Sequence, residues 1–204
     1  MEHPKLEQLI ATVETLRAPG GCAWDRDQTH ESLVRYLLEE TYELVDAIET
    51  GDDAELIEEL GDVLYQVLFH ADIAAEAGRF TLEDVAAHMN AKMVGRHPHV
   101  FGDREAETAD DVVAMWDDLK RVEKPSRTSV LDGVPQAMPS QLLADKLLGK
   151  TSVDAPALTW ASEEALGADL LGIVAAARAQ GLDTERALRS ALRGLQDDIR
   201  ASES

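Results

Sequence analysis

The feature that most restricts the fold of this chain is an acidic segment, residues 36–78, with 13 Asp or Glu residues and neither Lys nor Arg. Apolar residues recur in it every three or four positions, the period of an amphipathic helix. A solvated helix usually mixes both signs of charge, since Glu–Lys pairs one turn apart are favourable and like charges repel. A tight turn at Gly51 interrupts the segment. We therefore expect two antiparallel helices that concentrate negative charge.

The same helical period runs through most of the chain, and no segment alternates with the period of a strand. We expect an all-α fold with Thr29, Asp52 or Asp53, and Thr81 as helix caps. Loops are expected at 22–25 and 97–107. The expected helices cover about residues 5–17, 29–50, 53–77, 81–94, 108–123, 162–179 and 184–201.

We expect three parts along the chain: a helical domain at 1–124, a linker or irregular segment at 125–160, and a helical remnant at 161–204. Pro125, Pro135 and Pro139 lie in the middle part. The remnant resembles an incomplete second copy of the first domain, because Glu59-Leu60-Gly61-Asp62 aligns with Ala165-Leu166-Gly167-Ala168. Two Ala/Leu-rich helices also align this well by chance, so both interpretations stay open.

The charge balance excludes several classes of partner. Lys and Arg number 19 against 40 Asp and Glu, a net charge of −21, which disfavours binding to nucleic-acid polymers or to anionic membranes. No apolar run approaches the ~18 residues of a membrane-spanning helix, and the N-terminus lacks the pattern of a signal peptide. Cys22 is the sole cysteine, so no intrachain disulfide forms, and we expect a cytoplasmic protein.

Four carboxylates in the acidic segment have the spacing of a metal site. Glu40 with Glu43, and Glu59 with Asp62, form two pairs that each share a helix face. Glu43 lies eight residues before Gly51 and Glu59 eight after it, so both pairs lie about 12 Å from the turn. At ~5 Å and an effective dielectric constant of about 20, each like-charge pair costs about 3 kcal/mol. A hard divalent cation would turn this repulsion into affinity; a solvent-exposed acidic face is the alternative.

The motif around these carboxylates resembles the MazG family of nucleoside triphosphate pyrophosphohydrolases. It reads Glu39-Glu40-Thr41-Tyr42-Glu43, fifteen residues, then Glu59-Leu60-Gly61-Asp62, which is EExxE…ExxD. The resemblance extends over about residues 5–160, and makes 161–204 a truncated MazG-like copy without metal ligands. Three flanking segments carry it too: Gly21-Cys22-Ala23-Trp24-Asp25, Arg96-His97-Pro98-His99-Val100-Phe101 and Leu131-Asp132-Gly133-Val134-Pro135.

The resemblance implies a MazG-like antiparallel helical bundle completed by dimerisation. It implies an enzyme that cleaves NTPs or dNTPs to the monophosphate and pyrophosphate with Mg²⁺, or with Mn²⁺ in its place. Glu39 is the residue expected to orient or deprotonate the attacking water. The expected metal ligands are Glu40, Glu43, Glu59 and Asp62.

The resemblance also implies a nucleotide-binding set and a homodimer. Surface charge and core packing are alternative roles for the members of the set. The expected substrate contacts are Lys92, Arg96, Trp116 and Lys120.

Residues outside these sets receive simpler interpretations. Trp24 and Asp25 are expected to fix their loop, although this loop could border the base pocket. His97 and His99 are expected to be structural or to contact a partner subunit, and Cys22 is expected to have no role in the site.

Two competing functions remain open. One is a non-catalytic helical module that binds nucleotide or a partner protein. The other is a related all-α pyrophosphatase for dUTP, dCTP or phosphoribosyl-ATP. The intact carboxylate set favours an enzyme, and the resemblance implies a role in nucleotide-pool housecleaning.

Overall fold

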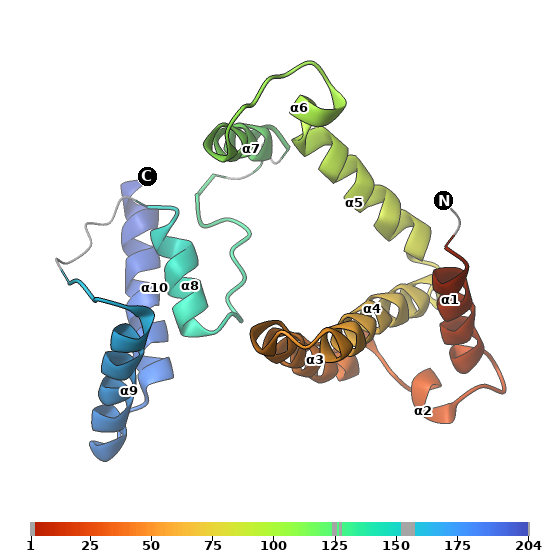
Figure 1. The fold of residues 1–204 in the computed structure, drawn as a ribbon, viewed down its shortest axis with the longest axis horizontal. Helices are drawn as coiled ribbons and strands as arrows, with labels where there is room; N and C mark the ends of the chain where they lie inside the picture. Colours follow the sequence, from red (N-terminus) through yellow and green to blue (C-terminus); the bar gives the residue numbers. More distant parts are fainter. Residues whose placement is uncertain (1–2, 124–125, 127, 152–157, 204) are drawn as a thin grey trace. The chain divides into compact units, whose positions relative to one another are not determined.

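The computed structural model describes residues 3–123, 126, 128–151 and 158–203, without the side chains of residues 117, 118, 120 and 121. The chain forms two compact units, residues 1–108 and 109–204, each of which is described by itself (Figure 1). Every regular element in the described part is a helix. The expected all-α fold is therefore confirmed.

The first unit contains the helices expected from the periodicity and two short ones that were not. Helices α2 and α6 lie where the sequence predicts loops, and each is a single turn; Pro98 at the first position of α6 has the backbone angle that a helix start requires. The elements are α1 (Pro4–Arg17), α2 (Ala23–Arg26), α3 (His30–Thr50), α4 (Asp53–Glu76), α5 (Leu82–Arg96) and α6 (Pro98–Phe101).

The residues expected as N-caps lie at the starts of α3 and α4. Thr29 accepts a hydrogen bond from the backbone N–H of Ser32 at 3.2 Å, and the Ser32 hydroxyl accepts one from Thr29 N–H at 2.9 Å. Asp52 accepts from the first N–H groups of α4. Gly51 between them has φ 74°, a left-handed conformation that glycine adopts without strain. Together they fix the turn that pairs α3 with α4.

A buried arginine joins three helices of the first unit. Arg17 of α1 donates to Asp72 at 2.6 Å and to Glu76 at 2.7 Å, both on α4. It also donates to the backbone carbonyl of Asp25 in α2 at 2.6 Å and lies over the ring of Phe69. The buried apolar residues of this unit are Val13, Leu33, Ala47, Leu68, Phe69, Ala71 and Ala74.

The other side of α3 and α4 exposes apolar side chains. They lie at helical spacing, and Ile57 is 73% exposed. We call this set the exposed apolar face. Its members are Val34, Leu38, Tyr42, Val45, Ile48, Ile57, Leu60, Leu64 and Val67.

The second unit contains α7 (Ala109–Glu123), α8 (Ser140–Leu148), α9 (Glu163–Ala179) and α10 (Thr184–Ser202). Leu143 and Leu147 of α8 are buried one turn apart, and α10 caps the start of α8 because Ser140 donates from its backbone N–H and its hydroxyl to Glu185. The core of the unit is Leu131, Val134, Leu143, Leu147, Leu192 and Ile199.

Two features of this unit differ from the expected organisation. The segment 125–160, predicted as a linker or irregular, contains α8 and supplies four of the six residues of this core. The division falls after Thr108, so that α7 groups with the second unit rather than with residues 1–108. The predicted parts 1–124 and 161–204, and the degenerate second copy, stay predictions.

Candidate metal and nucleotide site

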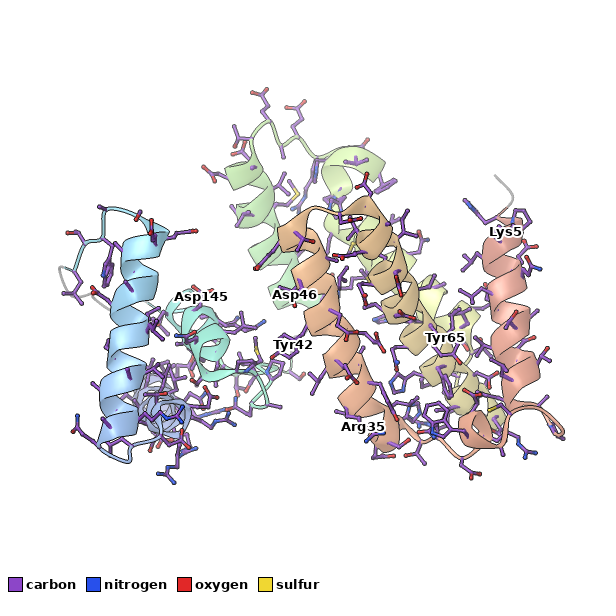
Figure 2. The ribbon with its side chains drawn as sticks, turned by 60° about the horizontal axis from the view of Figure 1, so that its bottom comes forward. Lys5, Arg35, Tyr42, Asp46, Tyr65 and Asp145 are labelled. Atoms are coloured by element: carbon purple, nitrogen blue, oxygen red, sulfur yellow. The ribbon has the colours of Figure 1, made fainter. Side chains whose placement is uncertain are left out.

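The paired helices α3 and α4 bring three of the predicted metal ligands together. Figure 2 shows the two helices side by side. Glu40, Glu43 and Glu59 each offer a carboxylate oxygen within 4.8 Å of the others. Glu40 and Glu59 are half-buried and Glu43 is exposed. Oε2 of Glu59 is buried without a hydrogen-bond partner among the described residues. We call these residues the carboxylate cluster.

The negative charges of neighbouring carboxylates raise one another's pKa values. Burial raises the pKa of Glu40 above its ordinary value, and so do the charges of Asp62, Glu43 and Glu59. Burial also raises the pKa of Glu59, with further contributions from Glu43, Asp62, Glu58 and Glu55. No Lys or Arg is among the groups that shift either pKa. Such a donor set, all oxygen and without a counter-charge from the described side chains, suits a hard divalent cation.

Two other predicted residues stand beside this cluster. Asp62 is half-buried, and its charge raises the pKa of both Glu40 and Glu59, so it lies close to both. Its oxygens fall outside the 4.8 Å group. Glu39 is exposed on α3 and also lies outside that group.

The predicted nucleotide contacts lie on α5 and α7. Lys92 and Arg96 are half-buried on α5, and neither is among the groups that shift the pKa of Glu40 or Glu59. Trp116 is half-buried on α7 in the second unit. The side chain of Lys120, also on α7, lies outside the part of the chain that the structure describes.

An aromatic pair, one of whose rings lies one turn before Glu40 on α3, is absent from the predicted site residues. Trp24 is 50% exposed, and its ring meets that of Tyr36 edge-on at 5.7 Å. The guanidinium of Arg35 lies 4.3 Å from the centre of the Tyr36 ring. Tyr36 precedes Glu40 by four residues, so both lie on one face of α3. That spacing was the available signal in the sequence.

The short helix that carries Trp24 is fixed in place by the contacts of Asp25. Asp25 is buried, accepts a hydrogen bond from Tyr65 at 3.3 Å, and binds Arg17 through its backbone carbonyl. Burial, followed by the charge of Asp25, raises the pKa of Tyr65 to about 12. The loop-fixing role predicted for Asp25 fits these contacts, whereas Trp24 is left with an exposed ring.

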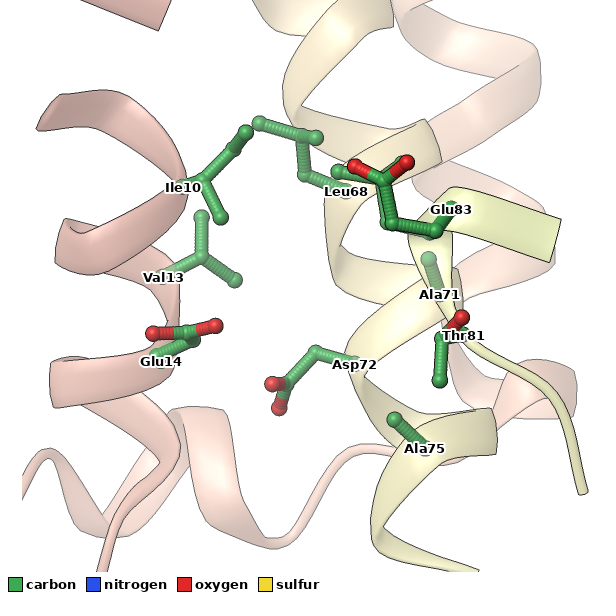
Figure 3. A pocket seen from close by; sticks show the side chains of 10 residues that line it. Ile10, Val13, Glu14, Leu68, Ala71, Asp72, Ala75, Thr81 and Glu83 are labelled. Carbon is green, nitrogen blue, oxygen red and sulfur yellow. The ribbon is translucent and has the colours of Figure 1, made fainter. Parts of the chain in front are cut away.

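A separate cavity of about 260 Å³ lies between α1, α4 and the start of α5 (Figure 3). Ile10 and Val13 face Leu68 across it. The ionisable groups that line it are carboxylates, among them Glu14 and Asp72, and its lining includes no Lys or Arg. Because phosphates need cationic or N–H donors, this cavity is a poor site for a nucleotide.

Among the described residues, no single helix is both long and apolar enough to cross a membrane. Only α9 and α10 taken together, across a bend of 105°, reach that length and composition.

Comparison with known proteins adds independent information. A family model described as the MazG nucleotide pyrophosphohydrolase domain matches residues 28–101, which include the carboxylate cluster. A 26.1 kDa protein from the blaB 3′ region of Streptomyces cacaoi is 48% identical over 202 residues, covering 96% of this chain and 83% of that protein.

Two relatives carry the name of an activity. The nucleoside triphosphate pyrophosphohydrolase/pyrophosphatase MazG of Thermotoga maritima is 52% identical over 123 residues, covering 60% of this chain and 47% of that protein. The nucleoside triphosphate pyrophosphohydrolase of Mycolicibacterium smegmatis is 40% identical over 205 residues, covering 98% of this chain and 60% of that protein. The chain thus spans 47% and 60% of the lengths of these two relatives.

Proposed function

We propose that this chain, which belongs to the MazG family of nucleotide pyrophosphohydrolases, hydrolyses NTPs or dNTPs to the monophosphate and pyrophosphate with Mg²⁺. The observation that carries the proposal is the carboxylate cluster of Glu40, Glu43 and Glu59, which forms no ion pair with a Lys or Arg among the described side chains. An acidic surface alone would repel a triphosphate of charge about −4. Two like charges about 4 Å apart near a protein surface raise the energy by about 4 kcal/mol. Both the protein and the substrate therefore require a divalent cation.

The residues present fit such a cation. The buried Oε2 of Glu59 has no hydrogen-bond partner among the described residues, which is the state expected of an oxygen that awaits a ligand. Glu40, Glu43, Glu59 and Asp62 would hold Mg²⁺ or Mn²⁺. When bound, the ion neutralises charge on the phosphate oxygens and lowers the pKa of a coordinated water.

We assign the remaining predicted residues to the substrate. Glu39, next to the first ligand, would orient the attacking water or accept its proton. Lys92 and Arg96 are one helical turn apart, so both can face the phosphates from α5. Trp116 and Lys120 of α7 would complete the nucleotide site, Trp116 by stacking on base or ribose.

We further assign Trp24 to the nucleobase, because its ring is exposed and its helix is fixed through Asp25. Base–aromatic stacking contributes about 1–3 kcal/mol per base, so Trp24→Ala should raise KM by about 5- to 150-fold. Trp24→Phe should restore most of this loss. An unchanged KM in Trp24→Ala would remove Trp24 from the site.

We propose that the chain forms a homodimer through the exposed apolar face. Nine apolar side chains on two adjacent helices are more than the single scattered residues that a monomer exposes. Light scattering at micromolar concentration tests this, and a monomeric mass would contradict it. Replacing Ile48 and Ile57 together by Gln should yield a folded monomer, whereas Val100→Gln, an equally exposed control on α6, should not.

The proposed role is the removal of NTPs or dNTPs from the nucleotide pool, in the cytoplasm where these substrates occur. An assay that measures pyrophosphate and orthophosphate separately, over the eight common NTPs and dNTPs, tests the reaction and its base preference. Release of pyrophosphate is expected. Binding of nucleotide without release would indicate the non-catalytic module, and activity restricted to dUTP or dCTP would indicate a related pyrophosphatase.

Two variants test the assigned metal ligands. Glu40→Gln and Asp62→Asn should each abolish turnover while the circular dichroism spectrum stays helical. Glu49→Gln is the matched control, because Glu49 is an exposed acid of the same helix, outside the carboxylate cluster. Full activity in both ligand variants would show that the assigned site is wrong.

A further inference from the structure

The open end of the α3–α4 pair contains two histidines in direct contact. Nδ1 of His30, the first residue of α3, lies 2.8 Å from Nδ1 of His70 on α4. The rings stack with centroids 5.1 Å apart and planes 11° apart. Residues 30–76 are all described. Two side-chain hydrogen bonds join α3 to α4 in this range: the His30–His70 contact and the Thr50–Glu55 bond beside the turn.

The position of this contact relates it to the carboxylate cluster. His70 follows Glu59 by 11 residues, or about three turns, so both lie on nearly the same face of α4. Any rotation or slip of α4 that separates His70 from His30 therefore also moves Glu59 relative to Glu40 and Glu43. The turn fixes one end of the helix pair, and the histidines fix the other.

The chemistry of the contact admits one proton between the two nitrogens. Nε2 of His30 is buried without a partner among the described residues, so a proton there would be an unsatisfied N–H group. The favoured tautomer of His30 therefore has its proton on Nδ1 and donates it to Nδ1 of His70. A further proton on His70 would set two N–H groups against each other.

We propose that His30 and His70 are positioning residues, a proton-sensitive brace that fixes α4 against α3 and thereby sets the geometry of the carboxylate cluster. The proposal rests on the metal-binding part of the proposed function. The brace is intact while Nδ1 of His70 is free to accept the hydrogen bond from His30, and it opens when that nitrogen takes up a proton.

The charged groups around the pair are few. Glu31 follows His30 in the chain. Backbone and Thr29 hydrogen bonds, and to a smaller extent the charges of His30 and Arg79, lower the pKa of its carboxyl. On the other side of α4, Asp72 and Glu76 are bound to Arg17. No carboxylate is among the groups that shift the pKa of His70, which burial and then the charge of His30 lower from its ordinary value. A proton on His70 is therefore disfavoured in the folded chain.

The direction of the pH dependence follows from that shift. A histidine whose pKa is lower in the folded than in the unfolded state contributes its stability above the unfolded value of about 6.5. This contribution is lost as the pH falls from there through the folded pKa. The brace should thus weaken in mildly acidic solution.

The test is calorimetric titration with Mg²⁺ alone, without nucleotide, from pH 5.5 to 8 on the full chain. His70→Ala should lower Mg²⁺ affinity at pH 8 by about tenfold, the smaller end of the range seen when groups that hold metal ligands in place are removed. His70→Asn should retain affinity, because its amide oxygen reaches the position of Nδ1, accepts from His30 and does not titrate. His88→Ala, an exposed histidine on α5, should match the wild type.

The pH profile of the Mg²⁺ affinity distinguishes a positioning role of His70 from a role in packing alone. Protons on Glu40 and Glu59 weaken Mg²⁺ binding in every variant, but the additional loss below pH 6.5 should be present in the wild type and absent in His70→Asn. Wild-type affinity in His70→Ala, or superimposable profiles for wild type and His70→Asn, would overturn the proposal. A failure to release pyrophosphate would instead refute the proposed function and leave the Mg²⁺ titration valid.

Discussion

Helix α4 carries acidic side chains in two settings, and the contrast separates structure from function. In its second half, Asp72 and Glu76 bind the buried Arg17 at 2.6 and 2.7 Å. In its first half, Glu59 faces Glu40 and Glu43 with no cation among the groups that shift its pKa. Acids that the chain itself neutralises stabilise the fold. Acids that it leaves facing one another repel, as expected of a site for a cation that the chain itself does not supply.

The largest change in unfolding free energy is expected in the second half of α4, where Arg17 neutralises the acids. Arg17→Ala would leave Asp72 without its counter-ion and break contacts to α2 and Phe69, and loss of one partner of a buried ion pair costs about 3–5 kcal/mol. Urea unfolding measures the loss. Arg26→Ala, an exposed arginine of α2, is the control and should change little. A loss at position 17 no greater than at position 26 would contradict the structural role.

A substitution in the carboxylate cluster is expected to increase the stability of the metal-free protein rather than to lower it. Glu59→Gln removes one of the facing charges, so the metal-free protein should unfold at a higher temperature than the wild type while Mg²⁺-dependent turnover is nearly abolished. Adding Mg²⁺ should then stabilise the wild type and not the variant. Thermal unfolding with EDTA and with Mg²⁺ measures both. A lower unfolding temperature in EDTA would mean that Glu59 is structural, like Asp72.

The pH dependence of the metal-free protein sharpens the contrast further. The pKa values of Glu40 and Glu59 are raised in the folded state, so the folded chain binds more protons than the unfolded one between about pH 4.5 and those raised values. The stability contributed by these two groups therefore falls as the pH rises through that window. Mg²⁺ should reverse the fall at higher pH.

Unfolding in EDTA between pH 4.5 and 8 tests this in the His70→Asn background, which removes the opposing titration of His70. Replacement of both Glu40 and Glu59 by Gln should flatten the curve. An unchanged slope in the double variant would assign the pH dependence to other groups.

The predictable part of the molecule is the part encoded by local spacing. The apolar period and the caps Thr29, Asp52 and Thr81 predicted α3, α4 and α5, and the two intervals of eight residues about Gly51 predicted that Glu43 and Glu59 would meet. Both follow from the fixed rise of a helix and one tight turn.

Contacts between residues far apart in the sequence could not be predicted in this way. Arg17 meets Asp72 across 55 positions, and His30 meets His70 across 40. Helix α8 is only nine residues long and is stable because Leu147 packs into the same core as Leu192 of α10, whereas the prolines before it favoured an irregular segment. In each case packing between distant segments decides the structure, and no local pattern specifies it.

The smallest effect is expected at the turn, where an acid has a partner of a third kind. Asp52 accepts hydrogen bonds from the backbone N–H groups of Ala54 at 2.8 Å and Glu55 at 3.3 Å, so it is neutralised by the start of a helix rather than by a cation. Asp52→Ala should cost about 1 kcal/mol of unfolding free energy, the usual cost of losing such a cap. Asp53→Ala is the matched control, because Asp53 is the adjacent exposed acid and does not cap α4. If acidity alone set the outcome, both variants would gain stability as Glu59→Gln is expected to do. A loss at position 52 alone, measured by urea unfolding, would show that the partner of each acid determines whether it stabilises the fold.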